Sequence, residues 1–368
     1  MDKRKLLQIP KGTESFELEE AYIHKKIVGG LLDLFYRWGF LPIETPVFDF
    51  YDIYSNVMDR QARDRVYRLI DRDGELLMLR SDITLFMAKQ IGLLMPDSMH
   101  PLRVCYADTI LRYQKNEDIS HNEFFQAGAE FIGKDGLEAD LEIILLLLSS
   151  LKLLGIEDSM LHIGSRNLFK LCVGTPAKNT EGPVRKQLLK AVRVRDWNRF
   201  NKVLEENELN GEGRNFIELF SFIGTGKELK QMFKSKYSGE TSDVKKEVEY
   251  LVSIYEYLEE LNFADNVKID LSELGGQDYY SGLSFKVYLK DVDTAIASGG
   301  RYNNLLSSFG YNAPAVGFSI MLRKVERVKK AAGQFKKPDV ITVLDDPDFL
   351  VRYRKAEKLR NSGRIVCL

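Results

Sequence analysis

The stretch from Leu111 to Gly133 constrains the fold most strongly, because it places two strand-like segments on either side of a single polar loop. Leu111-Arg112-Tyr113 precedes the loop, and Phe124-Phe125-Gln126 follows it. This pattern predicts an antiparallel hairpin with a long tip. A further strand is predicted at Leu102–Tyr106, directly before the hairpin. The chain is therefore expected to contain an antiparallel sheet.

Polar residues alternate along the second arm of this hairpin. Gln126, Gly128 and Glu130 share parity, so a strand presents all three on one face. In a twisted sheet, Arg112, Gln126 and Glu130 can point at one small polar ligand. Solvated residues on a surface hairpin fit the same pattern, and the pattern alone leaves both interpretations open.

Length and composition narrow the class of protein. A chain of 368 residues is too long for one ordinary domain, and two or three are expected. The 53 basic and 54 acidic residues give a formal net charge of −1, without the long Lys/Arg runs of a dedicated nucleic-acid binder. The three cysteines lack CxxC spacing and the four histidines are scattered, so no metal site is expected.

Apolar runs give no sign of a membrane segment. The most apolar run, Ile143–Leu148, extends to Leu154 but is interrupted by Lys152 and is too short to span a membrane. No apolar segment of signal-peptide length follows the charged start, Met1–Lys5. The expectation is a cytoplasmic protein without membrane contact.

Helical and strand patterns are mixed along the first half of the chain. Apolar residues from Leu18 to Trp38 recur at helical spacing. Val66–Ile70 and Leu76–Arg80 flank a turn and predict a second hairpin. A helix is predicted from Ser81 to Ile91, and a long buried helix from Leu137 to Leu154. The mixture predicts an α+β fold.

Composition changes divide the chain into three parts. Residues 1–165 and 263–332 are expected to form one core, in which strands are predicted at Val267–Asp270, Leu283–Leu289 and Thr294–Ala297. Residues 166–262 have few strand signals and predict a helical insertion. Residues 333–368 predict a short, partial strand-helix-strand unit.

Two glycine pairs, Gly275-Gly276 and Gly299-Gly300, lie beside the predicted strands. Neither belongs to a GxGxxG or GxxxxGK[ST] phosphate loop, so nucleotide binding of those kinds has no support. Glycine pairs allow the backbone to approach a ligand or another strand closely. The pattern does not choose between these two uses.

Taken together, these segments resemble class II aminoacyl-tRNA synthetases and, within that class, the histidyl-tRNA synthetase family, over nearly the whole chain. The matching segments follow the family's order and spacing: Pro10-Lys11-Gly12-Thr13, Phe40–Phe48, Leu79–Thr84, Arg112–Gln126, Asp278-Tyr279-Tyr280, Gly299–Tyr302 and Ala315–Phe318. The resemblance implies an α+β fold in which helices flank an antiparallel sheet. It also implies a histidine pocket formed by Asp82, Thr84, Arg112, Gln126, Glu130, Tyr279 and Tyr280.

The chain departs from the synthetase pattern at positions that serve the phosphates of ATP. Gly275 stands where the family carries an arginine, and Met321-Leu322-Arg323-Lys324 replaces Gly-Leu-Glu-Arg. Gln114 replaces a glutamate, and Ser120 and Asn122 replace basic residues. Adenylation needs fixed cations at the developing phosphate charge, each worth a few kcal/mol of barrier. The losses therefore argue against adenylation.

A kept amino-acid pocket without phosphate-binding cations resembles a paralogous family, the regulatory subunits of ATP phosphoribosyltransferase. Their Leu-Arg-x-Asp-x-Thr segment resembles Leu79–Thr84. This resemblance implies a subunit with no catalytic residue, cofactor or metal, in a hetero-oligomer with the short-form catalytic subunit. It further implies a homodimer within that assembly and histidine as feedback effector, with tRNA binding disfavoured. The alternatives are an active histidyl-tRNA synthetase and a class II-like scaffold with an unrelated partner.

Overall fold

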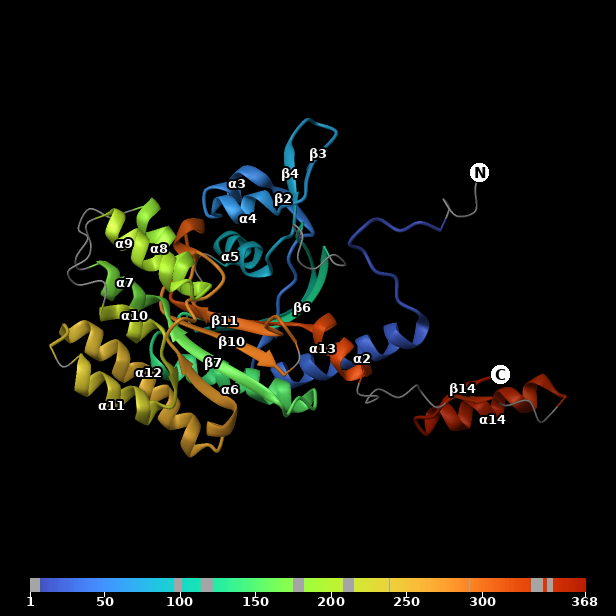
Figure 1. Ribbon diagram of the computed structural model, residues 1–368. Coiled ribbons are helices and arrows are strands. Elements are labelled where there is room, and N and C mark those ends of the chain that lie inside the picture. The colour runs from blue at the N-terminus through green and yellow to red at the C-terminus, as the bar shows by residue number, and fades with distance from the viewer. Residues whose placement is uncertain are drawn as a thin grey trace. The chain divides into compact units, whose positions relative to one another are not determined.

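The computed structural model describes residues 7–95, 101–113, 122–174, 182–207, 215–237, 239–290, 292–331, 340–342 and 347–368 (Figure 1). Two compact units make up the chain: one of Met1–Glu14 with Gly30–Arg323, the other of Ser15–Gly29 with Lys324–Leu368. The predicted hairpin tip with Gln114 and Ser120 lies outside the described residues. Among the described residues, no helix is both long and apolar enough to cross a membrane.

A nine-stranded sheet forms the centre of the first unit, in the order β1-β5-β6-β12-β11-β10-β7-β9-β8. The strands are β1 (Leu41–Pro42), β5 (Leu102–Leu111), β6 (Glu123–Ile132), β7 (Ser159–Ser165), β8 (Ile223–Gly224), β9 (Val267–Asp270), β10 (Leu283–Leu289), β11 (Ala297–Arg301) and β12 (Ala315–Met321). All neighbours from β5 to β7 are antiparallel. Because β1 joins β5 and β9 joins β7 in parallel, the whole sheet is mixed. The predicted α+β class is confirmed.

The central hairpin, β5 with β6, is the one predicted from the sequence. The two segments predicted before its tip differ from the structure, since β5 runs without a break from Leu102 to Leu111. Arg112 then makes an isolated bridge with Val66, so it lies at the end of the strand instead of within it. From this position the Arg112 side chain donates to the Ser81 carbonyl and to Asp82, at the start of the helix that begins at Ile83.

The third predicted strand is displaced. We expected it at Thr294–Ala297, but β11 spans Ala297–Arg301 and includes the glycine pair. A Cβ atom at Gly299 would lie 2.4 Å from the Gly317 carbonyl oxygen and 2.4 Å from the Phe285 ring. These glycines therefore serve close strand packing, one of the two uses that the sequence left open.

Helices α5 (Ile83–Leu94) and α6 (Leu137–Leu153) cover opposite faces of the sheet (Figure 1). Both are rich in buried apolar residues, as a core-facing helix requires. The predicted N-terminal helix is α2 (Leu18–Arg37). Its last turns belong to the first unit, where Phe35 packs edge-on against Phe318 with ring centroids 6.0 Å apart.

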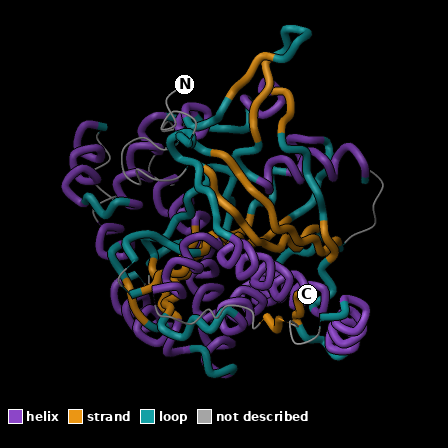
Figure 2. The backbone as a smooth tube through the Cα atoms, turned by 90° about the vertical axis from the view of Figure 1, so that its right-hand side faces the viewer, coloured by secondary structure: helices purple, strands orange, loops and turns teal. Residues whose placement is uncertain are grey.

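A small three-stranded sheet contains the predicted second hairpin. Its strands are β2 (Phe48–Phe50), β3 (Arg68–Ile70) and β4 (Leu76–Leu79), and β3 and β4 form the hairpin. Two short helices, α3 (Tyr51–Ser55) and α4 (Arg60–Asp64), lie between β2 and β3 in the chain. The β3–β4 hairpin projects from the rest of the first unit in both views (Figures 1 and 2). Arg80, only 1% exposed, joins this sheet to β5 by donating to the carbonyls of Thr45 and Thr109.

Residues 166–262 are mostly helical, as expected: α7 (Arg166–Gly174), α8 (Pro183–Arg193), α9 (Trp197–Glu206), α10 (Asn215–Phe220), α11 (Gly226–Lys236) and α12 (Ser242–Glu260). The segment also supplies the edge strand β8, which pairs with β9. Its helices fall within the first compact unit.

The second unit contains the C-terminal strand-helix-strand. Strands β13 (Val340–Thr342) and β14 (Ile365–Cys367) are parallel, and α14 (Phe349–Asn361) connects them. Most of α13 (Leu322–Ala331) also belongs to this unit, where His24 Nδ1 lies 2.6 Å from Glu326 Oε1.

Candidate functional site

The structure brings all seven residues of the predicted pocket to one cavity at the sheet. Asp82 and Thr84 come from the start of α5, Arg112 follows β5, Gln126 and Glu130 lie on β6, and Tyr279 and Tyr280 lie between β9 and β10. The other lining residues are Tyr106, Gln277, Ser298, Tyr302, Gly317, Phe318, Ser319 and Met321. The ligand of these residues stays a prediction.

Glu130 lies at the bottom of this cavity and is 1% exposed. Its Oε1 accepts hydrogen bonds from Thr84 Oγ1 at 2.9 Å and from the Tyr106 hydroxyl at 3.3 Å, and its Oε2 accepts one from the Tyr302 hydroxyl at 2.5 Å. Burial raises the pKa of Glu130 to about 8, although the hydroxyls of Tyr302 and Thr84 oppose the rise. The raised pKa favours the protonated form of this carboxyl near neutral pH.

Two glycines make room for the Glu130 side chain and its tyrosine neighbour. A Cβ atom at Gly317, which lies opposite Glu130 in the sheet, would stand 1.5 Å from Glu130 Oε2. A Cβ atom at Gly128 would stand 2.6 Å from the Tyr106 hydroxyl. The cavity therefore depends on positions that carry no side chain.

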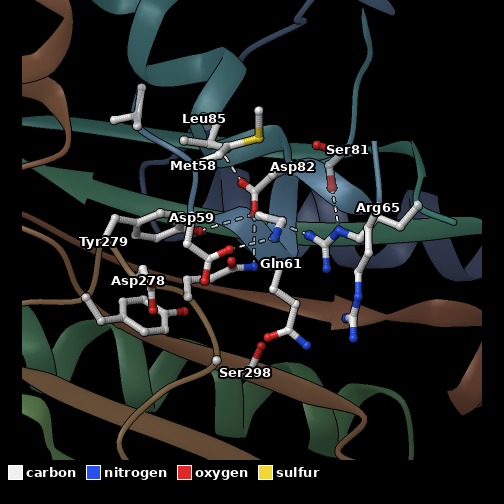
Figure 3. A pocket seen from close by; sticks show the side chains of 16 residues that line it. Met58, Asp59, Gln61, Arg65, Ser81, Asp82, Leu85, Asp278, Tyr279 and Ser298 are labelled. Atoms are coloured by element: carbon white, nitrogen blue, oxygen red, sulfur yellow. Dashed lines mark hydrogen bonds and ion pairs between the residues drawn. The ribbon is translucent and has the colours of Figure 1, made fainter. Parts of the chain in front are cut away.

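Asp82 has two tasks at the start of α5. Its Oδ1 accepts the Leu85 backbone N–H at 3.1 Å and so caps the helix. Its Oδ2 accepts from Arg112 Nη2 at 3.2 Å, from Gln277 Nε2 at 3.1 Å and from the Tyr279 hydroxyl at 3.3 Å (Figure 3). One oxygen of Asp82 therefore caps the helix, and the other connects three side chains that line the cavity.

Aromatic rings form one side of the cavity. Tyr279 meets Tyr280 and Tyr302 edge-on, with centroids 5.3 and 5.7 Å away. Burial raises the pKa of the Tyr106 and Tyr302 hydroxyls, and the Glu130 carboxylate raises both further. These hydroxyls therefore remain hydrogen-bond donors at neutral pH.

A larger cavity of about 300 Å³ adjoins the first and shares Asp82, Arg112, Gln277, Tyr279 and Tyr280 with it. Its remaining wall includes the segment from Val57 to Arg65 and Asp278 (Figure 3). Across the described ranges, no group of three or more His, Cys, Asp or Glu side chains is arranged to hold a metal ion.

Gly275 explains why an arginine does not fit where the synthetase pattern carries one. Its φ angle is +73°, and a Cβ atom there would stand 2.2 Å from Cδ2 of Tyr280. A side chain at this position would strain the backbone and displace the tyrosine wall. The departure noted in the sequence is thus built into the shape of the cavity.

Sequence reasoning missed three polar residues of the cavity: Tyr106, Gln277 and Tyr302. Tyr106 lies opposite Gly128 in the β5–β6 ladder and so shares the face of Gln126 and Glu130. Once the register of the β5–β6 hairpin is known, the pairing of Tyr106 with Gly128 identifies Tyr106 as a cavity residue. Gln277 directly precedes the recognised Asp-Tyr-Tyr segment, and Tyr302 ends the Gly-Gly-Arg-Tyr segment; these positions were the available signal.

Comparisons with known proteins give matches over most of the length of this chain. The histidyl-tRNA synthetase family model matches residues 12–325. The ATP phosphoribosyltransferase regulatory subunit of Clostridium kluyveri is 28% identical, with 96% of this chain and 91% of that protein covered. The one of Thermoanaerobacter sp. strain X514 is 30% identical, with 98% and 94% covered.

Solved structures share the fold. The structure from Bacillus halodurans C, titled an ATP phosphoribosyltransferase regulatory subunit/histidyl-tRNA synthetase, has a TM-score of 0.85 at 24% identity and covers 99% of this chain and 92% of that one. The histidyl-tRNA synthetase of Nostoc sp. PCC 7120 has a TM-score of 0.79 at 21% identity, with 98% and 85% covered. At these identities the likeness establishes the class II synthetase-like fold.

Proposed function

We propose, on the premise that this chain belongs to the histidyl-tRNA synthetase family, that it is the regulatory subunit of an ATP phosphoribosyltransferase in histidine biosynthesis. Relatives with that name match at 26% to 30% identity over nearly the whole chain. The single observation that carries the proposal is the cavity itself. It gathers the seven predicted residues beside a glycine that leaves no room for a phosphate-binding arginine.

Histidine is the proposed effector, and the cavity offers a partner for each of its polar groups. Glu130 and Asp82 pair with the α-ammonium or the imidazole, and Arg112 pairs with the carboxylate or with a water beside it. Gln126 orients the ligand, and the rings of Tyr279 and Tyr280 pack against the imidazole. A cationic group entering the cavity favours the ionised form of Glu130, so binding near pH 7 releases a proton.

The chain itself is proposed to perform no catalysis. Adenylation places charge on phosphates, and the site holds Gly275 where a cation is needed. Purified protein is therefore expected to show no histidine-dependent exchange of pyrophosphate into ATP. Clear turnover in that assay would identify a histidyl-tRNA synthetase and overturn the proposal.

The proposed partner is the short-form catalytic subunit, joined in a hetero-oligomer in the cytoplasm, with tRNA binding not expected. A homodimer of this chain is proposed within that assembly. Exposed apolar side chains on the small sheet support such an interface: Phe48 and Phe50 are 55% and 46% exposed, and Ile70 is 72% exposed. Exposed apolar residues that gather on one element are typical of interaction surfaces.

Regulation follows from linkage. Histidine shifts the assembly between two states by no more than the difference in its affinity for them. By reciprocity, the state that the catalytic subunit favours also sets the affinity of this chain for histidine. The cavity therefore needs no contact with the catalytic centre to control it.

The direct test mixes this chain with a short-form ATP phosphoribosyltransferase and follows activity with and without histidine. We expect activity to depend on this chain and to fall when histidine is added. A Glu130→Gln variant should still activate the partner but lose inhibition by histidine. A charge-matched change far from the cavity, Glu260→Gln at the end of α12, serves as control. If wild-type protein shows no calorimetric histidine binding at millimolar concentrations, the pocket assignment is wrong.

A further inference from the structure

A second charge cluster is centred on Asp278, which lines the larger cavity but not the cavity around Glu130. Arg166 opens α7, and Arg193 ends α8. Both guanidinium groups turn toward one carboxylate, since Arg166 Nη2 lies 3.5 Å and Arg193 Nη2 lies 3.9 Å from Asp278 Oδ1. Arg166 Nη1 also donates to the Leu274 carbonyl at 3.3 Å.

Two donor atoms of the Arg193 guanidinium have no acceptor among the described residues. Its Nε and Nη2 atoms are enclosed, and neither makes a hydrogen bond in the part of the chain that the structure describes. The 3.9 Å separation from Asp278 is too long to be one. Leaving buried polar groups unpaired is unfavourable, and the penalty is larger for charged groups. Such a guanidinium is a group that a ligand can satisfy.

Further cations surround this pair. Burial lowers the pKa of Arg166, and the charges of Arg193 and Arg185 contribute to the lowering. Burial likewise lowers the pKa of Lys170, with help from Arg185 and Arg166. Electrostatic repulsion that lowers these pKa values acts between cations that lie near one another. The cations concerned are Arg166, Lys170, Arg185 and Arg193.

Carboxyl groups also face these cations: burial lowers the pKa of Arg193, whereas the charges of Asp278, Glu273 and Asp59 raise it. Burial raises the pKa of Asp59, and its hydrogen bond with Asp278 raises it further. The pKa of Asp278 is lowered despite burial, by that hydrogen bond and by Arg166. Asp59 is thus the carboxyl of this pair that holds a proton more readily, and Asp278 is the one that ionises more readily (both are labelled in Figure 3).

We propose that Arg166, Lys170, Arg185 and Arg193 form a binding site for a phosphate- or diphosphate-bearing anion. Guanidinium groups bind phosphoryl oxygens through paired N–H donors. Two guanidinium groups turned toward one position favour an anion with several acceptor oxygens over a single carboxylate. The bound anion replaces Asp278 as the acceptor and satisfies Arg193 Nε and Nη2. The site is separate from the cavity around Glu130 and does not depend on the proposed histidine function.

Calorimetry on the full chain tests the site with three probes: inorganic phosphate, inorganic pyrophosphate and a magnesium-free nucleoside triphosphate. We expect saturable binding of pyrophosphate that weakens as sodium chloride is added. A triphosphate that binds more tightly than pyrophosphate identifies a nucleotide as the ligand, and equal affinities identify the inorganic anion. Absence of saturable binding by all three probes at about 1 mM overturns the proposal.

Two variants of opposite sign separate a ligand site from a structural cluster. Arg193→Gln should weaken pyrophosphate binding about tenfold or more, since a hydrogen bond to a charged group is lost. Asp278→Asn should tighten it severalfold, because the competing carboxylate charge is removed. Arg199→Gln, an exposed arginine on α9 that donates to Gln187, is the matched control and should change little.

Both variants can be judged even if one folds poorly. A circular dichroism melt identifies an unfolded Arg193→Gln protein, and Asp278→Asn then carries the test alone. Unchanged or weaker binding by a folded Asp278→Asn protein overturns the site. Histidine titration of the same samples shows whether the cavity around Glu130 is intact, so the failure of one site is not mistaken for failure of the other.

Discussion

Arg301 and Tyr302 are neighbours in the chain, yet they serve two buried carboxyl groups on opposite faces of the sheet. On the α6 face, Arg301 Nη2 lies 2.6 Å from Asp140 Oδ1, and its Nε lies 3.0 Å from the same oxygen. On the α5 face, the Tyr302 hydroxyl donates to Glu130. Asp140 is 0% exposed and Glu130 is 1% exposed, so the two carboxyls are equally enclosed but differently compensated.

The difference concerns which charge balances each carboxyl group. Asp140 has a cation within the protein and also accepts from the Tyr250 hydroxyl, so its charge is balanced without a ligand. Glu130 instead accepts hydrogen bonds from the hydroxyls of Thr84, Tyr106 and Tyr302, which carry no charge. A balanced pair holds the fold together, whereas a carboxyl supplied with donors alone is suited to receive a cationic ligand.

The largest effect is expected at the balanced pair. Replacing Arg301 by leucine leaves Asp140 buried beside no cation, and breaking such a pair costs about 3–5 kcal/mol. Urea unfolding of Arg301→Leu, followed by circular dichroism, should show a loss of that size. If the variant is as stable as wild type, Arg301 and Asp140 do not form the structural pair described above.

A double variant separates lost charge balance from lost packing. Arg301→Leu with Asp140→Leu removes both ions, and apolar replacements of a buried pair are often neutral. The double variant should therefore recover much of the stability that the single change removes. A double variant less stable than Arg301→Leu would show that shape, and not charge, dominates at this place.

The second effect is a pH dependence of stability that arises from Glu130. The pKa of Glu130 is raised in the folded protein from an ordinary value of 4.5 to about 8. The folded state therefore binds this proton more tightly than the unfolded state does. The stabilisation that the bound proton provides is complete below about pH 4.5. It is lost as pH rises to about 8, at no more than about 1.4 kcal/mol per pH unit.

Comparing wild type with Glu130→Gln isolates this contribution, because other titrating groups are shared. The stability of the variant should rise relative to wild type between pH 5 and 8 and then stay level, measured by urea unfolding without histidine. If the stabilities of wild type and variant change in parallel across that range, Glu130 is ionised in the folded protein without histidine.

The third effect is on the ligand. Glu130→Gln keeps the shape of the side chain but removes its charge, so histidine affinity should fall about tenfold to a hundredfold, as for a hydrogen bond to a charged group. Titrations near pH 7 in buffers of different ionisation enthalpy should show proton release by wild type and none by the variant. Equal proton release by both would assign the proton to another group.

The sequence predicted part of this comparison. Gln126 and Glu130 followed from strand alternation, and Asp82 followed from the resemblance of Leu79–Thr84 to a segment of the synthetase family. Which of Arg301 and Tyr302 faces the cavity was not predictable, since both stand in one recognised segment and only the position of β11 in the sheet decides. Tyr106 was missed because its place depends on the β5–β6 register, which no local pattern states.

The domain boundaries show a similar limit. Helical periodicity correctly predicted that residues 166–262 are mostly helical. The contacts of that segment with the sheet, such as β8 with β9, join residues far apart in sequence and leave no local signal. Its status as a separate insertion stays a prediction, and so does the boundary at residue 333.

The smallest effects are expected within the ring of hydroxyls, where the two tyrosines can be ranked against each other. Tyr302 donates to Glu130 at 2.5 Å and Tyr106 donates at 3.3 Å, so the Tyr302 bond is the stronger. Tyr302→Phe should weaken histidine binding by about 1 kcal/mol, or severalfold, and Tyr106→Phe by less.

Each loss of a tyrosine hydroxyl should also raise the pKa of Glu130 further, because a donor to the carboxylate disappears. The pH at which stability levels off should thus move upward in the same order, Tyr302→Phe more than Tyr106→Phe. The reverse order would mean that position in the cavity, and not hydrogen bonding to Glu130, sets the role of each tyrosine.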